Sequence, residues 1–274
     1  MNRLQPAGWM PPFTWGDDDH VTRLYLSLGL FLIASFVVFT PAMILDQRMV
    51  DSSYVWIKPQ KFNVSLALHF LTLAVLVQLV PSNIRNGAIL MIFSYLAAGA
   101  LIFEYIYITI QAGRARRSHF NFETEIEALM YAAMGIAAVL MVLVALVLAI
   151  QIWRKGDRSR PGVWLGSIVG LSLGFFTTMV FAGYMSSTGR YVGATLEGGG
   201  AIVPLFGWSR EYGDLRPAHF FSLHLMQTVP FAGWLADRRA WNPRLVVLSV
   251  AGAQVALATF LFLQARAGRP VWPV

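Results

Sequence analysis

Long apolar stretches, separated by mostly short polar connections, dominate the pattern of this chain. A helix needs about 20 apolar residues to cross the hydrocarbon core of a membrane, and seven stretches meet that length. They are predicted at residues 22–45, 59–80, 87–111, 125–152, 162–186, 218–236 and 243–265. Continuous apolar runs favour helices over a barrel of alternating strands. The pattern therefore predicts an all-α fold, a polytopic membrane protein whose single domain (residues 1–274) is a seven-transmembrane-helix bundle.

Turn and capping residues mark several of the predicted helix ends. Pro59 begins the second helix, and Thr124 with Glu127 has the spacing of a capping box at the start of the fourth. Pro217 suits the first turn of the sixth helix, whereas Pro230 should kink it. These signals support the boundaries drawn from the apolar runs.

The composition agrees with a membrane environment. Hydrophobic residues make up 57% of the chain and charged residues 13%, against about a quarter charged in soluble domains. The net charge is +7, but the basic residues lie at the ends of apolar runs rather than on one soluble face. We therefore expect membrane lipids as partners and no nucleic acid; the oligomeric state stays open.

Basic residues also indicate an orientation. Seven crossings place the termini on opposite sides, and short loops on the N-terminal side are rich in arginine and lysine: Arg154, Lys155, Arg158, Arg160, Arg238, Arg239 and Arg244. Under the positive-inside rule, the N-terminus is predicted in the cytoplasm and the C-terminus outside. Residues 1–20 lack the layout of a signal peptide, so we expect the first helix to be retained as an anchor.

The second predicted helix carries a polar stripe. Lys58 precedes it, and Lys61, Ser65 and His69 recur every four residues, which places them on one face. His69 lies about 15 Å inside the membrane at 1.5 Å per residue, and an ionisable group at that depth suggests a functional site. Alternatively, the lysines reach the lipid headgroups and His69 forms an interhelical hydrogen bond.

A second polar group begins inside the third predicted helix and continues into the connection that follows it. Glu104 lies about 10 Å inside the bilayer, where a carboxylate must be protonated, paired or bound to a ligand. Gln111 lies two turns later on the same face, and Arg117 and His119 belong to the following connection. Guanidinium groups recognise carboxylates or phosphates, so this connection is a candidate for binding either a ligand or a lipid headgroup.

The connection at residues 187–217 is the longest in the chain and is predicted to be an outer cap loop. We expect residues 198–216 to fold over the mouth of the bundle, with Trp208 and Tyr212 as interfacial anchors. The loop and the sixth helix contribute further candidate ligand-binding residues: Asp214, Arg216, His219, His224 and Gln227.

Helix positions allow some of these residues to share a depth. His224 lies about 9 Å below the outer end of its helix, close to Glu104 and above His69. We therefore predict a polar pocket lined by His69, Glu104, His224 and Gln227. His69, Glu104 and His224 are candidate metal ligands, and histidines on two helices can also ligate haem. Zinc and haem b thus stay open as cofactors.

Three strings resemble an uncharacterised group of bacterial seven-helix membrane proteins: KPxKF at residues 58–62, SHFN at 118–121 and GDLRxxHFxxLHxxQ at 213–227. The resemblance implies a multi-pass location in the bacterial cytoplasmic (inner) membrane. Ser65 and His69 are also similar to the second helix of seven-helix zinc hydrolases such as alkaline ceramidases and adiponectin-receptor-like proteins. In that comparison Glu104 takes the place of an aspartate, and the pair His219 and His224 lies one helix early.

Three functions fit these patterns. The first is an integral membrane protein whose outward-facing polar pocket binds or transports a small anionic or lipid-like ligand. The second is a metal-dependent intramembrane hydrolase, and the third is a haem-binding membrane redox subunit. The first is our leading hypothesis.

Overall fold

The structure, a computed structural model, describes residues 19–51, 53–193 and 200–272. Outside these ranges lie most of residues 1–20, residues 198 and 199 of the predicted cap, and Val274 at the C-terminus. The helices are α1 (His20–Leu45), α2 (Ile57–Leu76), α3 (Ser82–Arg85), α4 (Ala88–Gly113), α5 (Glu125–Lys155), α6 (Pro161–Thr188), α7 (Arg216–Leu223), α8 (Leu225–Arg239) and α9 (Pro243–Arg266), with a short 3₁₀ helix η1 (Val77–Leu79). Two small antiparallel sheets pair β1 (Met49–Val50) with β2 (Ser53–Tyr54), and β3 (Tyr191–Val192) with β4 (Gly213–Asp214).

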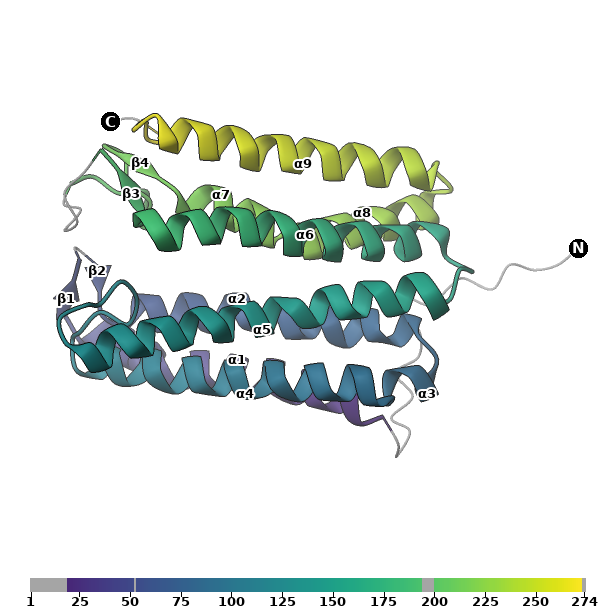
Figure 1. Cartoon of the computed structure of the whole chain (residues 1–274), viewed down its shortest axis with the longest axis horizontal. Coiled ribbons are helices and arrows are strands. Elements are labelled where there is room, and N and C mark those ends of the chain that lie inside the picture. The colour runs from purple at the N-terminus through teal and green to yellow at the C-terminus, as the bar shows by residue number, and fades with distance from the viewer. Residues whose placement is uncertain (1–18, 52, 194–199, 273–274) are drawn as a thin grey trace, which may run out of the picture.

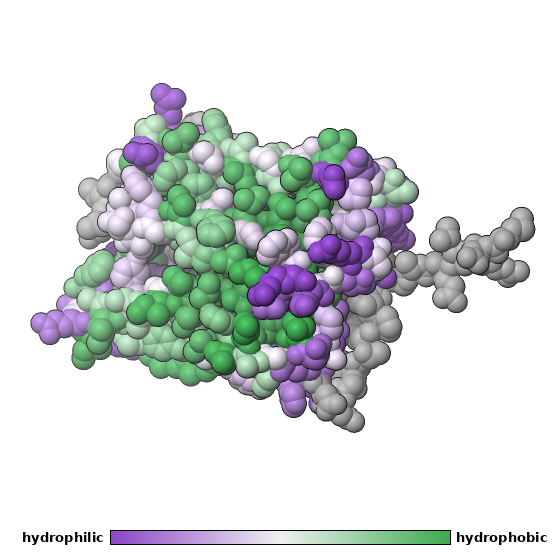
Figure 2. Space-filling view, turned by 45° about the vertical axis from the view of Figure 1, so that its right-hand side comes forward, coloured by the Kyte–Doolittle hydropathy of each residue, from purple (hydrophilic) through white to green (hydrophobic). Residues whose placement is uncertain are grey.

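The all-α prediction is confirmed. Within the described residues, six helices are long and apolar enough to cross a membrane: α1, α2 with η1, α4, α5, α6 and α9. Hydrophobic residues cover the middle of the face in Figure 2, and hydrophilic residues gather towards its ends. The predicted sixth segment, 218–236, forms two helices, α7 and α8, and neither reaches that length by itself.

The interruption between α7 and α8 lies at His224, six residues before Pro230, the position of the predicted kink. Pro230 is inside α8. At the interruption, the amide of Gln254 on α9 donates to the carbonyl of Phe221 at 2.7 Å, and its oxygen accepts from the hydroxyl of Thr228. A side chain of the neighbouring helix therefore bridges the two pieces.

The bundle consists of two halves. The N-terminal half comprises α1, α2, α4 and α5, and the C-terminal half comprises α6 to α9 (Figure 1). The largest buried cluster lies mainly in the N-terminal half, around Phe70, Leu101 and Leu148, but it extends to Leu171 on α6 and Met226 on α8. The described chain begins at one end of the bundle and finishes at the other (Figure 1).

Glycines hold α6 against α8. Gly162, Gly166, Gly170 and Gly174 recur every four residues on α6 and are buried. A Cβ atom at Gly166 would lie 2.7 Å from the carbonyl oxygen of Val229 on α8. The lack of side chains thus permits backbone contact between the two helices, as is common in membrane bundles.

We call the end of the bundle that carries both small sheets the hairpin end (Figure 1). The connection at residues 114–124 also lies there, and it leads into α5 through the predicted capping box. The hydroxyl of Thr124 accepts from the backbone N–H of Glu127 at 3.2 Å, which confirms that start signal.

Candidate functional site

One carboxylate joins three connections at the hairpin end. Asp51 lies between β1 and β2, with a positive φ of 52°. Its two oxygens contact Arg117 of the 114–124 connection at 2.6 Å and Arg190 after α6 at 2.8 Å. Burial would raise the pKa of Asp51, but the hydrogen bonds and charges of the two arginines outweigh it and hold that pKa below its usual value. Asp51 therefore links the two halves of the bundle as an ionised group.

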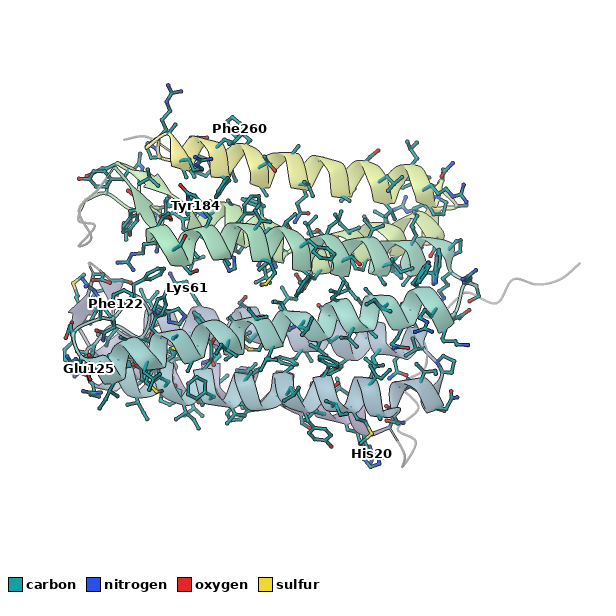
Figure 3. The ribbon with its side chains drawn as sticks, viewed as in Figure 1. His20, Lys61, Phe122, Glu125, Tyr184 and Phe260 are labelled. Carbon is teal, nitrogen blue, oxygen red and sulfur yellow. The ribbon has the colours of Figure 1, made fainter. Side chains whose placement is uncertain are left out.

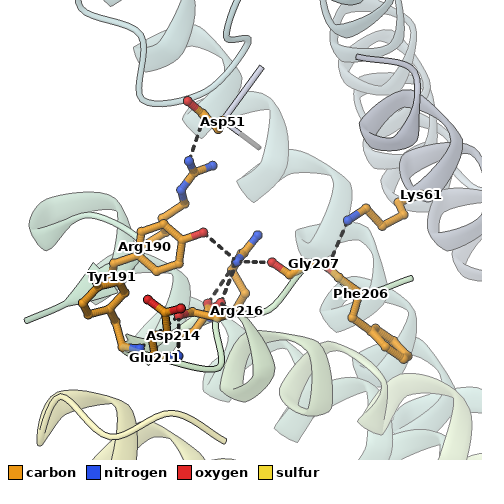
Figure 4. Close-up of polar contacts among 11 residues, drawn as sticks. Asp51, Lys61, Arg190, Tyr191, Phe206, Gly207, Glu211, Asp214 and Arg216 are labelled. Carbon is orange, nitrogen blue, oxygen red and sulfur yellow. Dashed lines mark hydrogen bonds and ion pairs between the residues drawn. The ribbon is translucent and has the colours of Figure 1, made fainter. Parts of the chain in front are cut away.

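A second, fully buried carboxylate organises the 200–216 loop. Asp214 accepts from the guanidinium of Arg216, with a shortest distance of 2.6 Å, and from the backbone N–H of Ser209 at 2.9 Å. Arg216 also donates to the carbonyl of Gly207 at 2.6 Å and to the hydroxyl of Tyr191 at 3.0 Å (Figure 4). The ion pair of Asp214 with Arg216 fixes the loop against the start of α7.

The same loop contacts the start of α2. The ammonium of Lys61 donates to the carbonyl of Phe206 at 3.0 Å, and Lys61 lies between the two halves near the hairpin end (Figure 3). Trp208 is buried, stacked on Phe206 at a centroid distance of 4.4 Å and packed edgewise on Phe220 at 5.6 Å. The described part of the predicted cap is thus packed on the bundle. Tyr212 is only partly buried.

Lys58 occupies a central position among these charges. It is partly buried and makes no hydrogen bond or ion pair to any residue that the structure describes. It lies within electrostatic range of Arg190, Glu104 and Asp51. Its surroundings differ from those of a lysine that reaches the headgroups, because cations and carboxylates from three other elements surround it.

Glu104 lies on α4 with 1% of its surface exposed. Its Oε1 is buried and has no hydrogen-bond partner among the described residues. Within the part of the chain that the structure describes, Lys58 is the one charged group that acts on it, although the two do not form an ion pair within 4 Å. Glu104 is therefore a buried acid beside a cation that it does not contact.

His119 lies near Lys58 as well, in the 114–124 connection. Burial, and then the charge of Lys58, lowers the pKa of His119 well below 6.5. Its ring packs edgewise against Phe62 on α2 at a centroid distance of 5.7 Å. His119 is consequently a neutral, aromatic-packed imidazole at neutral pH.

The other histidines lie deeper. His69 is buried, and its Nε2 contacts the carbonyl of Met141 on α5 at 3.0 Å, which is the interhelical hydrogen bond of the alternative interpretation. His224 contacts the amide oxygen of Gln227 through Nδ1 at 3.1 Å. The Nδ1 atom of His219 is buried without a partner among the described residues.

The predicted four-residue pocket is divided in the structure. His69 and His224 interact electrostatically, whereas Glu104 faces Lys58 instead. Across residues 19–51, 53–193 and 200–272, no three His, Asp or Glu side chains are grouped to hold a metal ion. The metal site predicted at His69, Glu104 and His224 is therefore not formed by these side chains.

Two further candidates, Gln111 and Ser65, form no hydrogen bond with Lys58 or Lys61 in the described part of the chain. The amide nitrogen of Gln111 donates to the carbonyl of Arg117 at 2.8 Å, and its oxygen accepts from Arg114 at 3.0 Å. Gln111 thus holds the 114–124 connection on α4. Ser65 is partly buried and forms no hydrogen bond with a described residue.

We define the hairpin-end site as the charged groups from both halves that interact with one another there. Its cations outnumber its carboxylates: Lys58, Lys61, Arg117, Arg190 and Arg216 against Asp51, Glu104 and Asp214. Asp51 and Arg190 were not predicted as site residues, because each lies in a connection with no motif around it.

The chain matches no protein-family model, no curated protein and no solved structure.

Proposed function

We propose that this chain is a seven-pass protein of the bacterial cytoplasmic membrane, in which α7 and α8 together form the sixth crossing. The two helices run from Arg216 to Arg239, a length of about 36 Å at 1.5 Å per residue, against a hydrocarbon core of about 30 Å. The bridge from Gln254 satisfies the carbonyl of Phe221 at the interruption, as a broken helix inside a membrane requires. The basic residues of the short loops favour an orientation with the N-terminus in the cytoplasm and the hairpin end outside.

We propose further that the hairpin-end site binds a small anionic ligand. The observation that carries this proposal is that neither lysine at the start of α2 forms an ion pair with a residue that the structure describes. Asp51 is engaged by two arginines and Asp214 by Arg216, so the carboxylates that the arginines use are not shared with Lys58 or Lys61. A partly buried ammonium without a counter-ion is costly, and an anion between the two halves removes that cost.

The donors of the two lysines suit a carboxylate, phosphate or sulfonate group. An ammonium has three N–H donors. Lys61 uses one on Phe206, so two remain while the loop stays attached. Lys58 has all three available with respect to the described residues. A free small anion and the headgroup of a lipid-like molecule share this chemistry.

The test is binding by the purified protein in detergent. Melting temperatures are measured with increasing methanesulfonate, phosphate or acetate, and separately with dodecyl phosphate as a lipid-like anion. We expect at least one to raise the melting temperature in a saturable manner. Saturation by the small anions indicates a free ligand, whereas saturation by dodecyl phosphate alone indicates a lipid-like one.

Lys61→Met tests the site, and Lys155→Met, an exposed lysine at the other end of the bundle, is the matched control. A charge-assisted hydrogen bond contributes about 1.5–3 kcal/mol, so Lys61→Met should weaken binding by roughly tenfold or more. Lys155→Met should bind as the wild type does. If no anion stabilises the protein, or if both variants bind equally well, the proposed site is wrong.

A further inference from the structure

We propose that Glu104 holds an exchangeable proton whose binding is linked to anion binding at Lys58, so that the site takes up an anion and a proton together. This inference rests on the proposed anion site and specifies its regulation. It is carried by a buried carboxyl oxygen on α4 that has no hydrogen-bond partner among the described residues, and by the position of Glu104 within electrostatic range of Lys58 on α2, which forms no ion pair with a described residue.

The surroundings of Glu104 disfavour its ionised form. Only 1% of its surface is exposed, and Oε1 accepts no hydrogen bond from a described residue. An isolated ionised carboxylate in such a place is strongly disfavoured unless an opposite charge compensates it. Lys58 is that opposite charge, and it acts at a distance beyond an ion pair. The charge of Glu104 therefore depends on whether Lys58 is already neutralised by something else.

Among the described residues, no charged side chain other than Lys58 acts on Glu104. Besides the short α3, the helices packed against α4 are α1, α2 and α5, and the charges of α1 and α5 lie in their first and last turns. The nearest acid on α5, Glu127, is held by Arg116 at 3.2 Å. On α2, Lys61 faces Asp214 and Arg216, and His69 is hydrogen-bonded to Met141. His119 faces Lys58.

Linkage fixes the sign of the effect. With the site empty, the positive charge of Lys58 favours ionised Glu104. An anion beside Lys58 cancels that charge and adds repulsion, so the carboxylate takes up a proton. By reciprocity, protonated Glu104 strengthens anion binding by the same factor. Anion affinity must therefore rise as the pH falls, and a monovalent anion enters with one proton and no net charge.

The experiment measures methanesulfonate affinity between pH 5.5 and 8, because this anion keeps one negative charge throughout that range. The wild type should bind more tightly at pH 5.5 than at pH 8, by about 5- to 150-fold, the usual span of coupling between two sites. Glu104→Gln, a neutral isostere of the protonated acid, should bind tightly at both pH values. Glu125→Gln, an exposed glutamate in the first turn of α5, should keep the wild-type pH dependence.

A second measurement does not need a variant. In weakly buffered solution, adding methanesulfonate to the wild-type protein should make it take up protons, up to one per anion bound. His119→Gln should leave both the pH dependence and the proton uptake in place. Wild-type affinity that is equal at pH 5.5 and 8 without proton uptake overturns the proposal, and so does a pH dependence that survives in Glu104→Gln. If no variant binds the anion at any pH, the proposed anion site itself is wrong. If the anion binds with the same affinity at every pH, the anion site stands and only the linked proton at Glu104 is refuted.

Discussion

Alanine at Gly166 should destabilise the bundle by forcing α6 and α8 apart. The new Cβ atom would lie 2.7 Å from the carbonyl oxygen of Val229 and 3.1 Å from the Cα atom of Pro230. Both are backbone atoms, so neither can rotate out of the way, and the helices must separate. Overpacking of this kind costs about 1–3 kcal/mol, and the helix preference of alanine over glycine returns up to about 1 kcal/mol. We expect a net loss of roughly 1–2 kcal/mol, a factor of about 5–30 in the folding equilibrium.

Gly183 supplies the control on the same helix. It is exposed, and a Cβ atom there would meet no atom within 4 Å. Gly183→Ala should therefore leave stability unchanged or raise it by up to about 1 kcal/mol. The two variants are compared by thermal and denaturant unfolding in one detergent. If Gly166→Ala is as stable as Gly183→Ala, the close contact between α6 and α8 does not exist.

Three further predictions concern topology, pH and the loop. A reporter fused after Val274 should lie outside the cytoplasm and one inserted near Asp157 inside it; the opposite result reverses the orientation. Since the pKa of His119 is lowered on folding, the unfolded state binds more protons below about pH 6.5, so stability should fall as the pH drops, by at most about 1.4 kcal/mol per unit. This slope should be shallower in His119→Gln. Trp208→Ala should change the rate of methanesulfonate binding while circular dichroism shows an intact helical bundle; unchanged kinetics would leave the loop without a gating role.

The apolar pattern was sufficient to predict most of the helices. Runs of about 20 apolar residues have few alternatives to a helix, and the capping box at Thr124 lies where the spacing placed it. The interruption at His224 was not predictable in the same way. It coincides with a hydrogen bond from Gln254, a residue of another helix, whereas the local signal pointed to Pro230. The glycine repeat on α6 is visible in the sequence, but the repeat alone does not show that α8 is the helix it packs against.

Many residues of the candidate site could be named from the sequence, but which of them lie together could not. Position along a helix gives depth, and His69 and Glu104 are buried as that depth predicts, whereas His224 is partly buried. Position does not give the neighbour that each side chain faces. Glu104 lies within electrostatic range of Lys58, and His69 contacts the carbonyl of Met141, so the predicted metal ligands do not form one group among the described residues. Asp51 lies in a turn that holds no motif, and its role appears only when three connections meet.

The two classes of cation in the hairpin-end site have different physical roles. Arg216 neutralises a fully buried Asp214, and removing one partner of such a pair costs about 3–5 kcal/mol, because the other charge stays buried and unpaired. The arginines therefore hold the loop and the halves together whether or not a ligand is present. Lys61 donates to a carbonyl and forms no ion pair with a described residue, so its loss leaves no ion-pair partner buried and unpaired there. Because Asp51 and Asp214 are held by arginines, Lys58 and Lys61 form no ion pair with a residue that the structure describes, and the proposed anion site depends on this difference between the two kinds of cation.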